Sequence, residues 1–414
     1  MRVPGDKSIS HRALMLAALG RGRSRIRGLL LSADVATTAE ALRLLGATIP
    51  ELTTGEMVIE GVGLRGLRTP ARDLDCGNSG TTTRLLAGIV AGAGVTARFD
   101  GDASLSARPM RRVAKPLEAM GASVELPPHG GLPMRVRGAP LRGVTWRTEV
   151  ASAQLKGAIL LAGLVGDVPV EVHEPEATRD HTERMLRARG VEVRTDGLTI
   201  SLLPAARLDA ADVVVPGDPS SAAFFAGLAA LGVGGSAVLE GVGVNPTRVG
   251  ALRALGRMGA TVRYASPAEQ GGEPVATVLI ERGLLRGIEI GGAEVPGLID
   301  ELPLLACVAA RAEGETRITG AAELRVKESD RIRAIVDNLR AIGAEADELP
   351  DGFVIRGSDR PLRGAVTTQG DHRIAMAFGV LGAVPGNVIT LDDPSCVAVS
   401  YPHFWDDLGR HGHE

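Results

Sequence analysis

A motif that occurs six times constrains the fold of this chain more than any other feature. Each copy is a short turn rich in Gly, Ser, Asp or Asn that leads directly into an apolar, alanine-rich stretch. The turns begin near positions 5, 77, 152, 217, 300 and 371, so consecutive copies are 65 to 83 residues apart. The 414 residues therefore divide into six repeats of about seventy residues each.

Each turn has the composition of a helix start, because Ser, Asp and Asn side chains cap the free N–H groups of a first helical turn. Between the turns, Gly follows further helix-like stretches, where a left-handed residue is expected to end the helix; these glycines are Gly46, Gly121, Gly190, Gly259 and Gly343. Short strand-like stretches, such as Thr261–Tyr264, come next. Two helices and several strands per repeat predict an α/β or α+β fold. The alternative is that a composition rich in Ala and Gly imitates a repeat, but composition alone does not place capping residues at every helix start.

Charge and composition exclude several classes of protein. The 46 Lys and Arg residues nearly balance the 49 Asp and Glu residues, so the net charge of −3 favours neither nucleic acid nor an anionic membrane as a partner. The apolar run Ala13–Leu19 is too short for a signal peptide and is followed by no cleavage site. The three cysteines form no CxxC pair. We therefore expect a cytoplasmic protein without membrane segments or disulfides.

Two short motifs resemble nucleotide sites but lack the context that such sites need. Gly61–Gly66 has the spacing G-x-G-x-x-G, yet Pro70 follows where a dinucleotide fold needs a helix. Gly5–Ser8 resembles the end of a P-loop, but the required G-x-x-x-x-G-K-[ST] is absent. The eight histidines form no H-E-x-x-H motif. We therefore predict no cofactor and no metal ligands.

Basic residues cluster beside the six turns. An isolated Arg is usually a solvated surface residue, but repeated cations next to helix starts favour a site for small phosphorylated or carboxylated anions. Asp300 and Glu328 lie near the same turns, where carboxylates serve either general acid/base catalysis or structural ion pairs. The cations are Lys7, Arg12, Arg108, Arg179, Lys327, Arg331 and Arg373.

Seven segments together resemble the EPSP synthase family, the 3-phosphoshikimate 1-carboxyvinyltransferases. They occur in the family's order over essentially the whole chain, and they are Pro4–Arg12, Leu74–Thr81, Gly101–Met110, Ala151–Lys156, Val215–Ser221, Leu324–Arg331 and Asp371–Met376.

The resemblance implies a two-lobed, inside-out α/β barrel in which each lobe has three βαβαββ repeats. Lobe I would comprise residues 1–6 and 217–414, and lobe II residues 7–216, with the active site in the cleft between them. The chain departs from the family in two places. It begins three residues before Pro4, where relatives carry a strand, so either the start has been assigned late or one sheet lacks its first strand. Val399 replaces a Lys that many relatives place near phosphoenolpyruvate.

The resemblance also implies the reaction and the residues that serve it. The family transfers the enolpyruvyl group of phosphoenolpyruvate to the 5-hydroxyl of shikimate 3-phosphate and releases phosphate. Asp300, Glu328 and Lys7 are implied as catalytic. Phosphoenolpyruvate would be bound by Lys7, Gly80, Arg108, Gln154, Arg331 and Arg373, and shikimate 3-phosphate by Lys7, Ser8, Arg12, Ser152, Gln154, Arg179, Asp300 and Lys327.

Gly80 bears on inhibition as well as on binding. In the family it borders the phosphoenolpyruvate site, and some members that resist glyphosate carry Ala there. We therefore expect open space beside Gly80 and an enzyme that glyphosate inhibits.

Two other functions are alternatives to this one. The UDP-N-acetylglucosamine enolpyruvyl transferase shares the fold, but it typically has Cys where this chain has Ala103, and Lys-Asn where this chain has Lys7-Ser8. A non-catalytic anion-binding repeat protein would need neither Asp300 nor Glu328. We expect a monomer with small-molecule substrates and no nucleic-acid or membrane partner.

Overall fold

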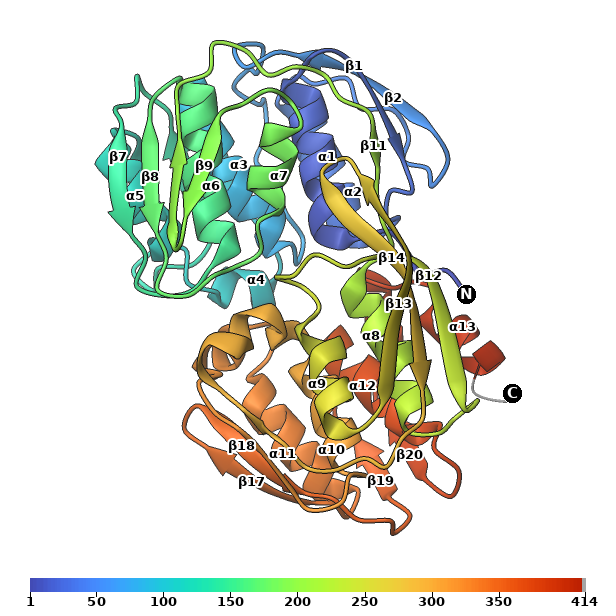
Figure 1. The fold of residues 1–414 in the computed structure, drawn as a ribbon. Coiled ribbons are helices and arrows are strands. Elements are labelled where there is room, and N and C mark those ends of the chain that lie inside the picture. Colours follow the sequence, from blue (N-terminus) through green and yellow to red (C-terminus); the bar gives the residue numbers. More distant parts are fainter. Residues whose placement is uncertain (412–414) are drawn as a thin grey trace. The chain divides into compact units, whose positions relative to one another are not determined.

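The computed structural model describes residues 1–411 and divides the chain into two compact units (Figure 1). Unit 1 comprises Met1–Pro4, Pro216–Ala268 and Pro274–Glu414, and unit 2 comprises Gly5–Val215 and Glu269–Glu273. Each unit has its own cluster of buried apolar residues. No helix within residues 1–411 is long and apolar enough to cross a membrane.

Unit 2 contains seven helices and three sheets among the residues that the structure describes. The sheets have the strand orders β11-β1-β2, β3-β4-β6-β5 and β7-β8-β10-β9. The strands are β1 Arg21–Arg27, β2 Met57–Val62, β3 Leu74–Asp75, β4 Thr96–Asp100, β5 Ser123–Glu125, β6 Met134–Arg137, β7 Val144–Arg147, β8 Val170–His173, β9 Val193–Asp196, β10 Thr199–Leu202 and β11 Val213–Val214. The helices are α1 Lys7–Leu19, α2 Ala33–Leu44, α3 Gly80–Ala93, α4 Ala103–Ala107, α5 Arg111–Met120, α6 Ala153–Gly166 and α7 His181–Arg187.

Unit 1 contains the remaining elements, except that the tip of the β13–β14 hairpin, Glu269–Glu273, belongs to unit 2. Its sheets have the strand orders β12-β14-β13, β15-β16-β18-β17 and β19-β20. The strands are β12 Ser236–Gly243, β13 Thr261–Gln270, β14 Glu273–Glu281, β15 Glu289–Ile290, β16 Glu315–Ile318, β17 Glu345–Leu349, β18 Gly352–Arg356, β19 Arg363–Val366 and β20 Val388–Leu391. The α-helices are α8 Pro219–Ala230, α9 Gly250–Met258, α10 Leu302–Ala309, α11 Arg331–Ala341, α12 His372–Gly382 and α13 Phe404–His411, and four 3₁₀ helices are η1 Gly292–Gly297, η2 Ile299–Glu301, η3 Ala322–Val326 and η4 Pro394–Val399.

The four-stranded sheets share one topology, which explains the periodicity of the sequence. In each, the first strand runs parallel to the second, which pairs antiparallel with the fourth, and the fourth pairs antiparallel with the third. The β7–β10 and β15–β18 sheets repeat this pattern. With the helices between the strands, each such repeat reads βαβαββ, as predicted.

The six predicted turns do begin six helices, namely α1, α3, α6, α8, α10 and α12. Five of them carry the expected cap, in which the side chain of Asp6, Ser79, Ser152, Asp218 or Asp371 accepts a hydrogen bond from a backbone N–H of the first turn. Helix α10 has no such cap, because the 3₁₀ turn η2 leads directly into it. The five predicted helix-ending glycines all have positive φ, between 78° and 114°.

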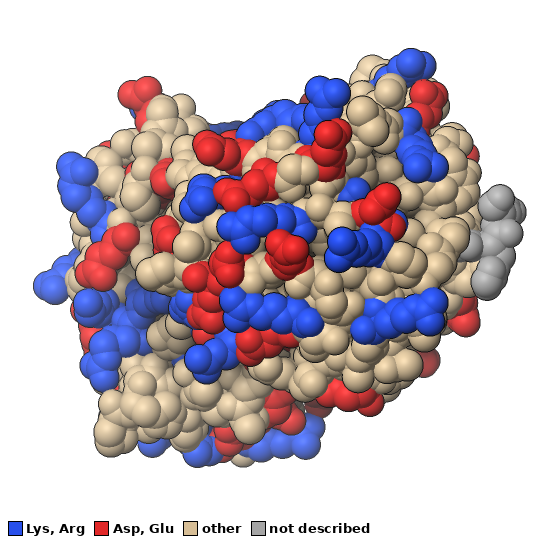
Figure 2. Space-filling model, turned by 90° about the horizontal axis from the view of Figure 1, so that it is seen from below, with Lys and Arg blue, Asp and Glu red and all other residues tan. Residues whose placement is uncertain are grey.

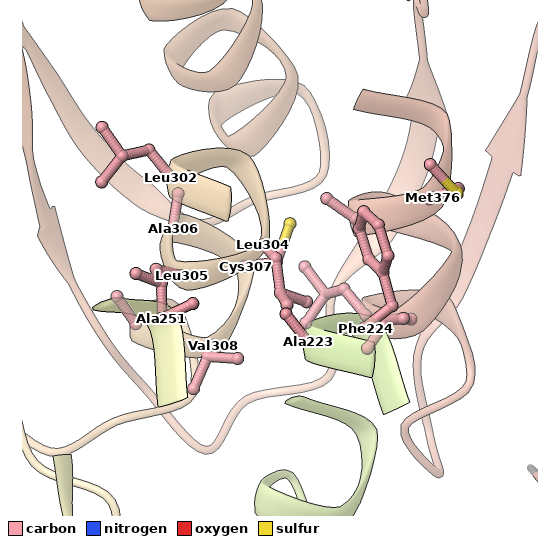
Figure 3. Packing of buried hydrophobic residues seen from close by; sticks show 14 of the residues in the cluster. Ala223, Phe224, Ala251, Leu302, Leu304, Leu305, Ala306, Cys307, Val308 and Met376 are labelled. Atoms are coloured by element: carbon pink, nitrogen blue, oxygen red, sulfur yellow. The ribbon is translucent and has the colours of Figure 1, made fainter. Parts of the chain in front are cut away.

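The six helices that begin at these turns form the cores. Their residues are buried on nearly all sides, as in α8, where all twelve residues are buried. Figure 3 shows Phe224 of α8, Leu304 and Cys307 of α10 and Met376 of α12 packed together in unit 1. In unit 2, a Cβ at Gly88 would lie 2.1 Å from the carbonyl oxygen of Ala158, so only Gly lets α3 and α6 pack this closely.

The first residues of the chain complete an edge of the β12 sheet. The Met1 amino group donates to the Val238 carbonyl oxygen (2.6 Å), and the Glu240 N–H donates to the Met1 carbonyl oxygen (2.9 Å). No strand is assigned to Met1–Val3, so both explanations of the short N-terminal segment stand, although Met1 makes two strand-like hydrogen bonds to β12.

Charges on the outer surfaces are mixed. Strands β16, β17 and β18 carry exposed ion pairs, such as Arg356 with Asp347 (2.8 Å). On the face shown in Figure 2, basic and acidic side chains alternate and neither sign dominates. This distribution agrees with the small net charge of the chain.

Candidate functional site

The predicted site residues of unit 2 lie at or near the starts of α1, α3 and α6 and in the segments before α5 and α7. In the first turn of α1, Lys7 pairs with Asp34 of α2 (Nζ to Oδ2, 3.0 Å), and the Lys7 side chain is 19% exposed. Arg12, one turn later, is buried and donates from Nε to Thr182 Oγ1 (2.8 Å) and from Nη1 to the Ser8 carbonyl oxygen (2.9 Å). Ser8 and Arg12 are therefore in contact.

Burial affects the two basic groups of α1 that lie farthest from solvent. Desolvation lowers the pKa of Arg12 to about 10, although Glu183 and Asp6 oppose this and Arg179 adds to it. Desolvation also lowers the pKa of His11 well below its ordinary value, and the charges of Lys7 and Arg12 lower it further. His11 is therefore neutral in the folded protein.

A chain of buried hydrogen bonds connects His11 to the start of α3. His11 Nδ1 contacts Thr38 Oγ1 (2.6 Å), Thr38 Oγ1 contacts Thr82 Oγ1 (2.6 Å), and the Thr82 hydroxyl donates to Ser79 Oγ (2.7 Å). Ser79 caps α3, whose first residue is Gly80. The chain therefore fixes the backbone at Gly80 relative to α1 and α2.

Arg108 and Gln154 are held by polar partners near Gly80. Arg108 Nη2 donates to Asn78 Oδ1 (2.6 Å), and the Asn78 amide in turn donates to Asp102 Oδ2 (2.7 Å). Gln154 accepts from Arg84 Nη1 at Oε1 (2.5 Å) and donates from Nε2 to Thr81 Oγ1 (3.0 Å).

The space beside Gly80 is not open, so that expectation is wrong. A Cβ at this position would lie 2.8 Å from Arg84 Nη1 and 3.5 Å from Arg108 Nη1. These neighbours are the ends of flexible side chains, so a methyl group would displace a guanidinium and not the backbone.

The predicted site residues of unit 1 form a network around Arg331. Its guanidinium contacts Asp300 Oδ1 through Nη1 (3.4 Å), Glu328 Oε2 through Nη2 (2.7 Å) and Asp371 Oδ2 through Nε (2.8 Å). Lys327 Nζ lies 3.3 Å from the same Asp300 oxygen. Burial would lower the pKa of Arg331, but Asp371, Glu328 and Asp300 outweigh it and raise the pKa above its ordinary value.

Arg373 lies in the first turn of α12, next to this network. Its backbone N–H donates to Asp371 Oδ1 (2.9 Å), its Nη1 is 4.0 Å from Glu301 Oε1, and its guanidinium carbon is 6.0 Å from the centre of the Phe224 ring. Asp371 therefore connects Arg331 and Arg373 while it caps the helix. The structure thus brings together Asp300, Lys327, Glu328, Arg331 and Arg373.

Several residues of these networks were missing from the sequence prediction. Asp34 and Arg84 contact predicted site residues, as do Asp371 and Glu301. The sequence could have identified Arg84, because this residue lies one helical turn after the Gly77–Thr81 turn. Lys7 and Arg12 were selected because they lie beside a turn of the same kind. No motif in the neighbouring sequence indicates that Asp34 contacts Lys7 or that Glu301 lies near Arg373. Within residues 1–411, no group of three His, Cys, Asp or Glu side chains could hold a metal ion.

Known proteins give the same interpretation of the fold. A family model described as EPSP synthase (3-phosphoshikimate 1-carboxyvinyltransferase) matches residues 1–408. The 3-phosphoshikimate 1-carboxyvinyltransferase of Sulfurihydrogenibium sp. is 47% identical over 415 residues, which cover 99% of this chain and 96% of that protein. The enzyme of the same name from Methylococcus capsulatus is 48% identical and covers 98% of this chain and 92% of its own.

A solved structure agrees with these relatives. The EPSP synthase from Acinetobacter baumannii superposes with a TM-score of 0.88 at 44% identity, over 100% of this chain and 95% of that one. These matches place this two-lobed α/β repeat protein, with its cations and carboxylates near helix starts, in the enolpyruvyl transferase class. Within that class, the chain belongs to the EPSP synthase family.

Proposed function

We propose how the residues described above share the work of the family's reaction. As a family member, the chain transfers the enolpyruvyl group of phosphoenolpyruvate to the 5-hydroxyl of shikimate 3-phosphate and releases phosphate, in the pathway to chorismate and the aromatic amino acids. Neither the UDP-N-acetylglucosamine reaction nor a non-catalytic role is favoured by these relatives.

The reaction needs both an acid and a base. Protonation of the methylene carbon of phosphoenolpyruvate makes its neighbouring carbon electrophilic, the hydroxyl adds to that carbon, and loss of the proton and of phosphate then restores the double bond. We assign removal of the hydroxyl proton to Asp300 and proton transfer at the methylene carbon to Glu328, with Lys7 between the two substrates.

The contact of Asp300 with both Lys327 and Arg331 carries this proposal. Two cations on one oxygen hold the carboxylate in a fixed position, as a general base requires. Glu328 also contacts Arg331, so the proposed acid, Glu328, and the proposed base, Asp300, both contact the same guanidinium group. The protons of such closely coupled groups belong to the set and not to a single residue.

The binding roles follow the predicted sets. Lys7, Gly80, Arg108, Gln154, Arg331 and Arg373 would bind phosphoenolpyruvate. Ser8 and Arg12 would bind the shikimate carboxylate, Ser152 and Arg179 its phosphate, and Lys327 with Asp300 its hydroxyls. We further propose that lobe I (residues 1–6 and 217–414) and lobe II (residues 7–216) enclose the substrates, and that the protein acts as a cytoplasmic monomer without a cofactor.

A phosphate-release assay tests the function directly. We expect release that needs phosphoenolpyruvate together with shikimate 3-phosphate, and none when UDP-N-acetylglucosamine replaces the latter. Release with the nucleotide sugar, or release without a second substrate, would contradict the proposal.

A further inference from the structure

A buried group of three charges lies in unit 2, next to residues predicted to bind substrate. Lys156 of α6 contacts Glu174 Oε2 (2.8 Å) and Glu183 Oε1 (2.7 Å), and all three side chains are at most 2% exposed. Burial would lower the pKa of Lys156, but Glu183 and Glu174 outweigh this and raise it, so the ammonium is charged. A charge in such a place needs partners in good geometry.

The two carboxylates lie on opposite sides of the segment that carries Arg179. Glu174 directly follows β8, and Glu183 is in the first turn of α7. The other oxygen of Glu174 accepts a hydrogen bond from the hydroxyl of Thr178, the residue before Arg179. Lys156 is therefore connected through Glu174 to Thr178, which is the residue next to Arg179 in the sequence.

The same lysine is fixed to the helix start that carries Ser152. The Lys156 N–H donates to the Ser152 carbonyl oxygen (3.0 Å) in the first turn of α6. At the next position, a Cβ on Gly157 would lie 3.1 Å from Thr182 Oγ1, so the starts of α6 and α7 are closely packed. Lys156 thus joins the helix of Ser152 to both sides of the Arg179 segment.

We propose that Lys156 is a positioning residue, which sets the separation of Ser152 and Arg179 and thereby the affinity for the phosphate of shikimate 3-phosphate. This inference rests on the proposed function, in which those two residues bind that phosphate. An ion group that serves only stability would affect unfolding but not the affinity for one substrate.

The test compares binding of shikimate 3-phosphate by calorimetry with steady-state kinetics for both substrates. For Lys156→Met we expect Kd and KM for shikimate 3-phosphate to rise about ten-fold or more, with kcat and the KM for phosphoenolpyruvate changed less than about three-fold. Since this variant leaves two buried carboxylates unpaired, a triple variant that adds Glu174→Gln and Glu183→Gln removes all the charges together. Thr178→Val is the mildest variant, and we expect a rise of about three-fold.

Arg189→Met is the matched control, because it also replaces a buried cation of unit 2 but contacts neither Glu174 nor Glu183. It should leave both KM values unchanged. Thr178→Val should have no further effect once Arg179 is changed to Ala, since both act through the same guanidinium.

The outcomes separate this inference from the proposed function. If Arg179→Ala weakens binding but the triple variant and Thr178→Val do not, the positioning role is wrong and the proposed function stands. If the effects of Thr178→Val and Arg179→Ala add, the positioning role is also wrong. If Arg179→Ala itself leaves the affinity unchanged, the assignment of the phosphate to Arg179 fails, and this inference with it.

Discussion

Replacement of Arg189 by Met should stabilise unit 2. Arg189 follows α7 and is 2% exposed, and its Nη1 donates to the Met185 carbonyl oxygen (3.1 Å). Within residues 1–411, its Nε and Nη2 atoms have no hydrogen-bond acceptor and no carboxylate pairs with it. A guanidinium is thus buried with most of its donors unsatisfied.

The size of the effect follows from the cost of that burial. Desolvation lowers the pKa of Arg189 to about 10, so the group is still charged at neutral pH and its burial opposes folding. At about 1.4 kcal/mol per pKa unit, the lowering corresponds to ~3 kcal/mol. Unsatisfied charged donors, at ~1 to 3 kcal/mol or more each, give the same order of magnitude. Met has a similar length and no polar hydrogen, so most of this cost should disappear.

The two tryptophans allow each unit to be followed separately. Trp146 is in β7 of unit 2, and Trp405 is in α13 of unit 1. In a Trp405→Phe background, fluorescence reports on unit 2 alone. A unit of about 200 residues gains ~2 to 4 °C in Tm per kcal/mol, so we expect Arg189→Met to raise this transition by about 5 to 10 °C.

Arg65→Met is the control, since Arg65 is an exposed residue of the same unit. It should shift Tm by less than about 1 °C, because surface substitutions are usually within ±0.5 kcal/mol. An unchanged or lower Tm for Arg189→Met would refute the reasoning, since it would mean that the guanidinium is satisfied.

Four further predictions concern the site. Asp300→Ala should leave binding measurable by calorimetry and lower kcat by about 10²-fold or more, as loss of a general base does; near-normal turnover would leave Asp300 a structural role. Lys7→Met should lower both kcat and affinity, because a cation between two anions serves binding and chemistry; a rise in KM alone would contradict this. Glyphosate should inhibit competitively with phosphoenolpyruvate, and Gly80→Ala should raise its inhibition constant about ten-fold, equal to ~1.4 kcal/mol. Because the added methyl meets Arg84, combining Gly80→Ala with Arg84→Lys should lower the inhibition constant part of the way back to the parent value. If glyphosate did not inhibit the parent enzyme, Gly80 would not be sufficient for sensitivity to it. His11 is neutral when folded but protonated when unfolded below pH ~6.5, so its contribution to stability falls by up to ~1.4 kcal/mol per pH unit as the pH drops; acid titrations of His11→Gln by circular dichroism should show a smaller loss.

The sequence predicted those parts of the fold that depend on local rules. Capping side chains and helix-ending glycines act within one turn, so the six helix starts and five helix ends could be located from the positions of these residues in the sequence. The missing cap of α10 could not be predicted, because the 3₁₀ turn before this helix depends on the surrounding packing.

Contacts between distant residues explain what the sequence did not reveal about the site. Asp34 lies 27 positions from Lys7, and Arg84 lies 70 positions from Gln154. Asp371 was recognised in its turn, but its pairing with Arg331, 40 positions earlier, follows only from the fold. Such pairs decide which cations have carboxylate partners, and the sequence alone does not show which residues form them.

The edge contributed by Met1–Pro4 has a consequence for the order of folding during synthesis. These residues belong to unit 1, but their partner strand β12 begins at Ser236, after nearly all of unit 2 has been made. At about 5 to 20 residues per second, a ribosome needs on the order of ten seconds or more to reach that strand. Through this interval Met1–Pro4 has no partner strand, while Gly5–Val215 can already bury its own core. Unit 2 is therefore expected to fold first, and Met1–Pro4 is expected to be among the last segments to pair.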